Sequence, residues 1–210
     1  MEHGAPLGDS ERFEDLLRSA IEPLGIALSE AQVQRLRDHY ELLCRWNAQI
    51  NLTSLRTLED VVTRHFAESL FLAEQLPDKG TVVDVGSGAG FPGVPISVAR
   101  PGLKVTLVDS NGKKAAFLQE VVRGESGVRV RSVRFSEVAG EYDWGVWRGV
   151  ALDDIEEDLP ARVRRVAAIT SARVIAGWEG SATINWSERH EIPWDRRRVV
   201  ILGECVSRGT

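Results

Sequence analysis

The chain has 210 residues, of which 43% are apolar, and a formal net charge of −5. This length can bury the core of one α/β domain with an appendage, or of two small domains, without disulfide bonds. The acidic balance argues against a protein that coats nucleic acid by bulk charge, although a local basic face is compatible with it. No segment approaches the ~20 consecutive apolar residues of a membrane span, and no apolar signal segment follows Met1. We therefore expect no membrane partner.

Cysteine usage points to a reducing compartment. The chain contains only Cys44 and Cys205, which form neither a disulfide framework nor a zinc-ligand spacing. We therefore expect a cytoplasmic protein without a metal site.

The first third of the chain has helical periodicity. Apolar residues at Val33, Leu36, Tyr40 and Leu43 recur at spacings of three and four, which places them on one stripe of a helix. The expected helices span residues 10–21, 30–46 and 58–75, with Ser29 capping the second. A breaking segment at 77–80 predicts a boundary between a helical N-terminal extension, residues 1–77, and a second domain, residues 78–210.

Strands and helices alternate after Gly80. We expect strands at 81–85, 104–108 and 128–133, with helices at 93–100 and 113–123 between them. Further strands are expected at 144–147, 173–177 and 198–202. Such alternation requires crossover connections and predicts an α/β fold with a parallel sheet.

A glycine-rich segment, DVGSGAGFPG, follows the first expected strand. It is not the dinucleotide pattern G-x-G-x-x-G, because Phe91 occupies the last glycine position, and no phosphate-binding loop is present either. The remaining pattern, D-x-G-x-G-x-G, resembles motif I of class I methyltransferases that use S-adenosylmethionine (SAM). Asp109 closes the next strand, where a carboxylate can accept hydrogen bonds from ribose hydroxyls. The alternative is a glycine turn that serves packing only.

A wider set of motifs resembles one family. NLTSLR at 51–56, RHFAESL at 64–70, DVGSGAGFPG at 84–93 and VDSNGKKAAFLQEV at 108–121 are similar to the RsmG family, also called glucose-inhibited division protein B. The resemblance is strong over residues 40–123 and weak beyond 155. It implies a Rossmann-like class I SAM methyltransferase fold, in which helices flank a mostly parallel twisted sheet. It further implies methylation at N7 of a guanine in the decoding-region loop of bacterial 16S ribosomal RNA.

The resemblance also implies roles for individual residues. Catalytic roles fall to Arg148, His65 and Asn51. SAM-binding residues are Asp84, Gly86, Ser87, Gly88, Gly90, Phe91, Asp109, Ser110, Ser136, Glu137 and Arg148, and RNA-binding residues are Arg64, Lys113 and Lys114. The implied partner is 16S rRNA or the small ribosomal subunit, and we expect a monomer.

Each of these assignments has a structural alternative. His65 is alternatively a hydrogen-bonded structural histidine, and Lys113 and Lys114 a solvated helix face. Arg148 is alternatively stacked on Trp147. The run Arg196–Arg198 is expected to lie on the surface, with RNA binding as its alternative.

Several positions depart from the family pattern. Glu68 replaces an aspartate, Phe135 an arginine and Trp147 a small polar residue, while Glu179 stands where the family has a Lys-Gly pair. These departures leave two other hypotheses open. One is a non-catalytic relative that binds SAM or ribosomes, and the other is a methyltransferase for a small molecule or a protein.

The implied reaction requires alignment of the reactants and no general base. N7 of guanine carries an in-plane lone pair and no proton, so the protein has to hold the base and the methyl donor in line. Arg148 is expected to orient the guanine or its phosphate. A basic excess over residues 104–134 predicts salt-dependent RNA binding.

Overall fold

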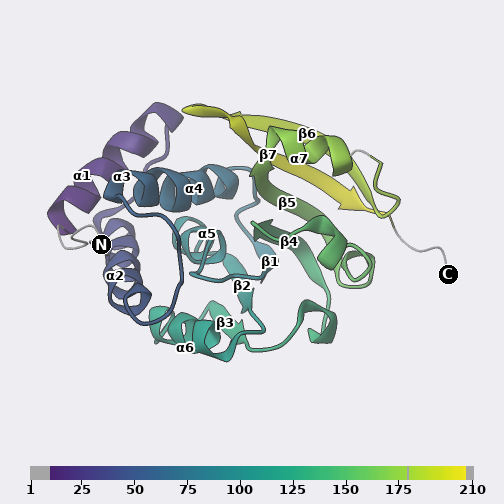
Figure 1. Cartoon of the computed structure of the whole chain (residues 1–210), viewed down its shortest axis with the longest axis horizontal. Coiled ribbons are helices and arrows are strands. Elements are labelled where there is room, and N and C mark those ends of the chain that lie inside the picture. The colour runs from purple at the N-terminus through teal and green to yellow at the C-terminus, as the bar shows by residue number, and fades with distance from the viewer. Residues whose placement is uncertain (1–9, 179, 207–210) are drawn as a thin grey trace.

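A seven-stranded sheet organises the molecule in a computed structural model that describes residues 10–178 and 180–206 (Figure 1). The strand order is β3-β2-β1-β4-β5-β7-β6. Pairing is parallel from β3 across to β5, and β7 runs antiparallel to both β5 and β6. The strands are β1 (Gly80–Val85), β2 (Leu103–Val108), β3 (Val128–Arg131), β4 (Tyr142–Arg148), β5 (Val163–Ser171), β6 (Ile184–Ile192) and β7 (Asp195–Cys205).

Helices provide the connections and the N-terminal layer. They are α1 (Ser10–Ile21), α2 (Glu30–Asn47), α3 (Leu58–Val61), α4 (Glu68–Ala73), α5 (Gly93–Ala99), α6 (Gly112–Val121) and α7 (Ala172–Trp178). A π-helical turn, η2 (Val62–Ala67), joins α3 to α4 without a break. Short 3-10 turns are η1 (Glu22–Leu24), η3 (Phe135–Glu137), η4 (Leu152–Asp154) and η5 (Leu159–Ala161).

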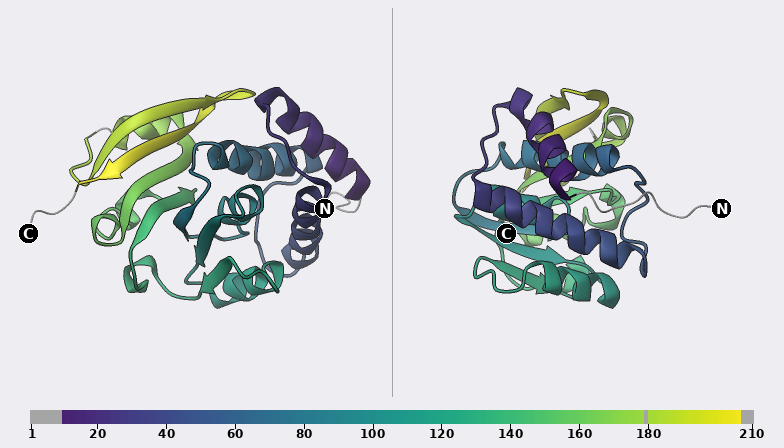
Figure 2. Two further views of the ribbon diagram at one scale, coloured as in Figure 1. Left: turned by 180° about the vertical axis from the view of Figure 1, so that it is seen from behind. Right: turned by 90° about the vertical axis from the view of Figure 1, so that its left-hand side faces the viewer.

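Two apolar cores lie on opposite faces of the sheet, because side chains alternate along each strand. On β4, Trp144 and Val146 join the core formed with α1 to α6, whereas Trp147 joins the core beneath α7 and the 3-10 turns. Figure 2 shows α1 and α2 (purple) on one side of the molecule, and the turn of the β6–β7 hairpin (yellow) reaching toward α1. Arg148 follows Trp147 on β4, so by alternation it lies on the same face as Trp144 and Val146, toward the N-terminal helices.

The helix α2 begins where the sequence predicts, whereas the helix expected at 58–75 is divided by the π-helical turn and ends at Ala73. Ser29 and Gln32 form a capping box at the start of α2, with the Ser29 hydroxyl accepting from the Gln32 amide. Arg100 fixes the segment between α4 and β1 by forming ion pairs with Glu74 and Asp78, both at 3.1 Å. These helices share one core with the sheet, and the division at residue 77 stays a prediction.

The α/β fold and its mostly parallel sheet are confirmed, but the C-terminal elements differ from the prediction. The expected strand at 173–177 is wrong, because these residues lie in α7, with Ile175 and Trp178 buried and Val174 exposed. The strands β5 and β6 were not expected. Paired charges within each of them, Arg164-Arg165 and Glu188-Arg189, conceal the apolar pattern.

No helix within the described ranges is both long enough and apolar enough to cross a membrane. Cys44 and Cys205 are free thiols.

Candidate active site

The candidate site lies where β1, β2 and β4 end. The strand order reverses between β1 and β4, since β2 lies on one side of β1 and β4 on the other. In open α/β sheets, ligands bind at such a switch point, outside the carboxyl ends of the strands. The glycine-rich loop follows β1, Asp109 follows β2, and Arg148 ends β4.

Ser87 joins the ends of β1 and β2. Its hydroxyl donates to the Asp84 carbonyl and accepts from the Val108 amide, both at 3.0 Å. Its own amide donates to the Val108 carbonyl at 2.9 Å. Ser87 is buried, so we interpret it as a brace for the loop.

The loop has a left-handed backbone with open space at its centre. Gly86, Gly88 and Gly90 have φ angles of 67°, 56° and 88°, which residues with a side chain rarely adopt. A Cβ at Gly88 would meet no atom closer than 3.7 Å, so this residue leaves room for a ligand to approach the backbone. At Gly93, by contrast, a Cβ would collide with Asp84 and Leu107. Gly93 is therefore required for the close packing of α5 on β1 and β2.

Asp84 and Asp109 have the chemistry that SAM needs. One Asp84 oxygen, Oδ2, accepts from the Gly93 amide at 3.0 Å, while Oδ1 is buried without a hydrogen-bond partner within the described ranges. Asp109 accepts from the amides of Gly88 and Asn111 at 2.9 and 2.8 Å. A carboxylate offers about four lone-pair sites, so both groups retain acceptor capacity for an ammonium or for hydroxyls. The residues present fit SAM.

Burial raises the pKa of Asp84 from 3.8 to about 7. At a pH between these two pKa values, Asp84 holds a proton in the folded protein that it has released in the unfolded chain. Stability therefore falls as the pH rises from about 4 to about 7. Asp84→Asn removes this dependence and keeps an oxygen for the Gly93 amide.

We therefore expect Asp84→Asn to raise the midpoint of thermal unfolding of the ligand-free protein at pH 8, by about 2–4 °C for each kcal/mol of relieved desolvation. The gain should vanish near pH 4, because the carboxyl of the folded protein is then protonated and carries no buried charge. Melting curves at the two pH values test this, and an equal gain at both would contradict it.

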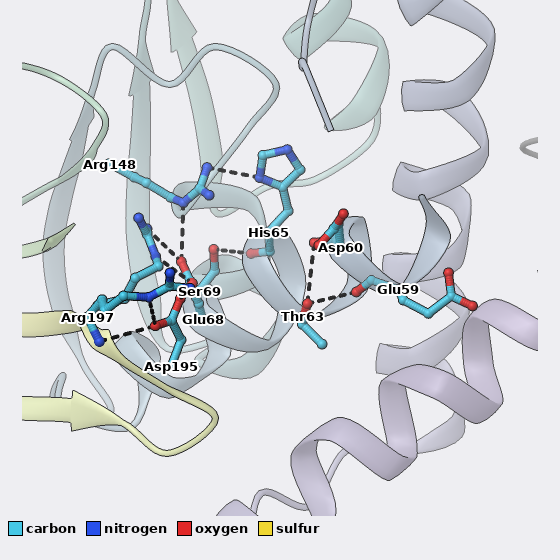
Figure 3. Close-up of polar contacts among 10 residues, drawn as sticks. Glu59, Asp60, Thr63, His65, Glu68, Ser69, Arg148, Asp195 and Arg197 are labelled. Atoms are coloured by element: carbon cyan, nitrogen blue, oxygen red, sulfur yellow. Dashed lines mark hydrogen bonds and ion pairs between the residues drawn. The ribbon is translucent and has the colours of Figure 1, made fainter. Parts of the chain in front are cut away.

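A second group of polar residues comes from the N-terminal helices. In η2, Thr63 donates to the Glu59 carbonyl at 2.7 Å, and Ser69 donates to the carbonyl of His65 just beyond the turn. Such side-chain bonds compete with the helical ladder and bend it, and π-helical turns are frequent at functional sites. The turn carries His65 toward the end of β4 (Figure 3).

His65 has both ring nitrogens engaged. Arg148 Nη1 lies 2.9 Å from Nδ1, and Thr53 Oγ1 lies 2.7 Å from Nε2. Because arginine can only donate, Nδ1 must accept, and Nε2–H donates to Thr53. The ring also stacks on Phe91, with a centroid separation of 4.4 Å and an interplanar angle of 7°.

Burial, followed by the nearby charge of Arg148, lowers the pKa of His65 to about 2. The imidazole is therefore neutral at physiological pH. Its remaining lone pair is occupied by the guanidinium of Arg148. The geometry makes His65 a support for Arg148 and not a general base.

Glu68 completes the cluster from α4. Its carboxylate is fully buried and takes both Nε and Nη2 of Arg198, at 2.6 and 2.8 Å. Arg148 Nε lies 3.5 Å from the same carboxylate. Figure 3 shows Arg148 between Glu68 and His65. Burial lowers the pKa of Arg148 to about 10, which leaves it charged at neutral pH.

The other predicted site residues are more exposed than this cluster. Asn51 is exposed, and its backbone neighbours Leu52 and Thr53 are held by the Asn47 side chain, at 2.9 Å in each case. Ser110 is exposed beside Asp109, and Ser136 and Glu137 are exposed in η3 after β3. Their roles stay predictions.

The predicted RNA-binding residues lie in two places. Lys113 and Lys114 form the first turn of α6, where Asn111 caps their amides, and Lys113 is exposed. Arg64 lies in η2, half-buried, with its Nε buried and without a hydrogen-bond partner among the described residues. Their role in RNA binding stays a prediction.

The departures from the family pattern mostly point away from the site. Trp147 is fully buried on the opposite face from Arg148, where it packs against Trp178 and Trp186 at centroid separations of 6.0 and 6.4 Å. This excludes stacking of Arg148 on Trp147. Phe135 is buried with the Arg162 guanidinium 5.7 Å from its ring centre. Glu179 lies outside the described residues.

Sequence reasoning missed three members of the site. Thr53 lies within the NLTSLR motif but was not singled out, and His39 supports the loop by bonding the Ala89 carbonyl at 2.8 Å. Arg198 was expected on the surface, which is wrong, because its side chain is only 15% exposed and pairs with Glu68. An arginine run carries no signal that separates its buried member from its exposed ones.

The fold and the glycine loop define a protein with the class I methyltransferase fold. A SAM-dependent methyltransferase from Aquifex aeolicus is similar in structure, with 17% identity, a TM-score of 0.54, and coverage of 66% of this chain and 90% of that one. TrmK from M. capricolum, solved with S-adenosyl-homocysteine, has 14% identity and a TM-score of 0.54, over 67% of this chain and 68% of its own.

Within that class, the chain belongs to the family described as rRNA small subunit methyltransferase G, or GidB, whose model matches residues 32–156. The ribosomal RNA small subunit methyltransferase G of Myxococcus xanthus is 41% identical, over 58% of this chain and 57% of its own length. That of Alkaliphilus metalliredigens is 38% identical, over 65% and 61%. A Syntrophobacter fumaroxidans relative is 34% identical, over 80% and 78%. The chain thus matches less than two thirds of the length of each of the first two relatives.

Proposed function

We propose that this chain transfers a methyl group from SAM to N7 of a guanine in the decoding-region loop of bacterial 16S rRNA. The observation that carries the proposal is the position of Arg148. It ends β4 beside the glycine loop and is held by His65 and Glu68 from the N-terminal helices. Family membership, with relatives named as small-subunit rRNA methyltransferases, supports the substrate. We further propose a cytoplasmic monomer.

SAM would be held by the first group of residues and would supply the methyl group. Asp109 would accept from its ribose, Asp84 would face its cationic end, and the backbone around Gly88 would lie against it. Guanine N7 has no proton to remove. His65 is neutral, and both of its ring nitrogens are engaged, so it has no free nitrogen to accept a proton. The contribution of the chain is therefore alignment of the base, which Arg148 provides as a hydrogen-bond donor and a positive charge.

RNA docking is proposed on the basic side chains around β2, β3 and α6. Arg129 and Arg131 on β3 and Lys104 on β2 are exposed, as is Lys113 on α6. Within residues 10–178 and 180–206, none of these four forms an ion pair with an acidic side chain, so their charge is available to phosphates. These side chains do not form one patch, because Lys104 lies opposite Thr81 at the far end of the strands and Arg129 and Arg131 alternate to the face away from α6. Methyl transfer should fall as salt rises.

Asp109→Ala is expected to weaken SAM binding by about 10- to 100-fold, because a hydrogen bond to a charged group contributes about 1.5–3 kcal/mol. Isothermal titration with SAM measures this. Asp143→Ala is the matched control, since Asp143, like Asp109, accepts from a backbone amide, that of Thr81 at 2.9 Å, but lies at the opposite end of the strands. Equal affinities for both variants and the unaltered protein would contradict the proposed ribose contact.

The proposed function is tested by offering labelled SAM and the protein three acceptors: small subunits lacking the modification, naked 16S rRNA, and ribosomal protein extract. We expect label in RNA, sensitive to ribonuclease and to high salt. Label that survives ribonuclease would select a protein or small-molecule substrate. SAM binding without transfer to any acceptor would select a non-catalytic relative.

A further inference from the structure

Arg198 reaches the candidate site from the C-terminal part of the chain. It lies outside residues 32–156, which the family model matches. In the antiparallel pairing of β5 with β7, Arg198 is opposite Ser171, the last residue of β5. Because β5 is parallel to β4 and β1, this places Arg198 at the sheet edge where the site lies.

The Glu68 carboxylate contacts two arginines, and its contact with Arg198 is closer than its contact with Arg148. Arg198 binds it through both ends of its guanidinium fork, at 2.6 and 2.8 Å, whereas Arg148 contacts it through Nε alone, at 3.5 Å. Glu68 is fully buried, and the arginine side chains are 15% and 16% exposed. A planar guanidinium matches a carboxylate best in the two-bond arrangement, so Arg198 holds the stronger of the two positions.

Arg148 keeps donors free as a result. Its Nη1 donates to His65, and within the described ranges its Nη2 has no hydrogen-bond partner. If Glu68 were not occupied by Arg198, the same carboxylate could take the fork of Arg148 in two bonds. The two-bond arrangement that Arg198 uses, through Nε and Nη2, would then be open to Arg148, and its Nη2 would be used within the protein while Nη1 stayed on His65.

We propose that Arg198 is a positioning residue: by occupying Glu68, it keeps Nη2 of Arg148 free as a donor for the RNA substrate. The inference rests on the proposed methyl transfer for its consequence in catalysis. It also explains the buried ion pair, since such pairs seldom improve stability over apolar packing.

The test compares Arg198→Met with the double variant Glu68→Gln, Arg198→Met. In the single variant Glu68 is left to Arg148, and single-turnover methyl transfer should fall by about 30-fold, within the ~10²-fold that a displacement of 1 Å can cost. In the double variant no carboxylate remains to capture Arg148, so we expect at least about a tenfold recovery. Arg198→Lys should fall between the unaltered protein and Arg198→Met.

Arg197→Met is the matched control. Arg197 neighbours Arg198 in the chain, but its guanidinium is exposed, and within the described ranges its one ion pair is with Asp195, at 2.8 Å. SAM affinity and thermal unfolding are measured for every variant. A purely structural role for Arg198 predicts that the double variant transfers no faster than the single one, which would overturn the inference.

A crystal structure of Arg198→Met gives a readout that does not depend on the substrate. We expect Arg148 to move onto Glu68 and to bind it through two bonds, from Nε and Nη2. An unmoved Arg148 would overturn the inference. Absence of transfer by the unaltered protein would instead refute the proposed function, and the structure of the variant would still decide the positioning.

Discussion

Glu68→Ala is expected to lower the free energy of unfolding by about 3–5 kcal/mol, because it leaves buried positive charge without its partner. The Glu68 carboxylate is fully buried and carries both bonds of Arg198 and the 3.5 Å contact of Arg148. Without it, two guanidinium groups face each other across a site that water reaches poorly.

Urea unfolding at pH 7 measures this loss directly, and the midpoint of thermal unfolding should fall by about 6–20 °C. Glu204→Ala is the control, since Glu204 forms an exposed ion pair with Arg165 at 3.1 Å. That variant should change stability by less than about 0.5 kcal/mol. Similar small effects for both variants would show that the buried network does not bear on stability.

Arg148→Ala is expected to slow methyl transfer by about 10²–10³-fold at saturating SAM, the typical loss when one preorganised donor is removed from an active site. The fold should survive, because Glu68 keeps both bonds from Arg198. Arg148→Lys should be nearly as slow, because a lysine cannot contact His65 and Glu68 and also offer a directed donor to RNA.

Single-turnover rates on small subunits that lack the modification measure this effect, with SAM affinity measured separately. Arg164→Ala is the control, since Arg164 lies at the start of β5, at the opposite edge of the sheet, and is exposed. A rate for Arg148→Ala within about threefold of the unaltered protein would remove Arg148 from the reaction, given the losses typical of such donors.

The cofactor side of the site could be predicted from the sequence because its signals are local. Glycines at 86, 88 and 90 are required by the left-handed loop, and Asp109 follows the next strand at a fixed place in the fold. The capping signal at Ser29 likewise acts within one helical turn. Such features depend on neighbours in the chain, which sequence patterns describe well.

The network around Arg148 could be predicted only in part, because it joins residues far apart in the sequence. His65 and Arg148 are 83 positions apart, and Glu68 and Arg198 are 130 apart. The family resemblance suggested His65 and Arg148, but Arg198 required the register of β7 against β5. Burial of Trp147 away from Arg148 was equally hidden, since alternation along β4 is readable only once the strand and its two cores are known.

The most direct test of the central claim is to identify the nucleoside that the protein modifies. Small subunits lacking the modification are incubated with labelled SAM and the protein, the RNA is digested, and the labelled nucleoside is identified and mapped. We predict 7-methylguanosine in the decoding-region loop of 16S rRNA. Label in another nucleoside, at another position, or in protein would contradict the proposed function.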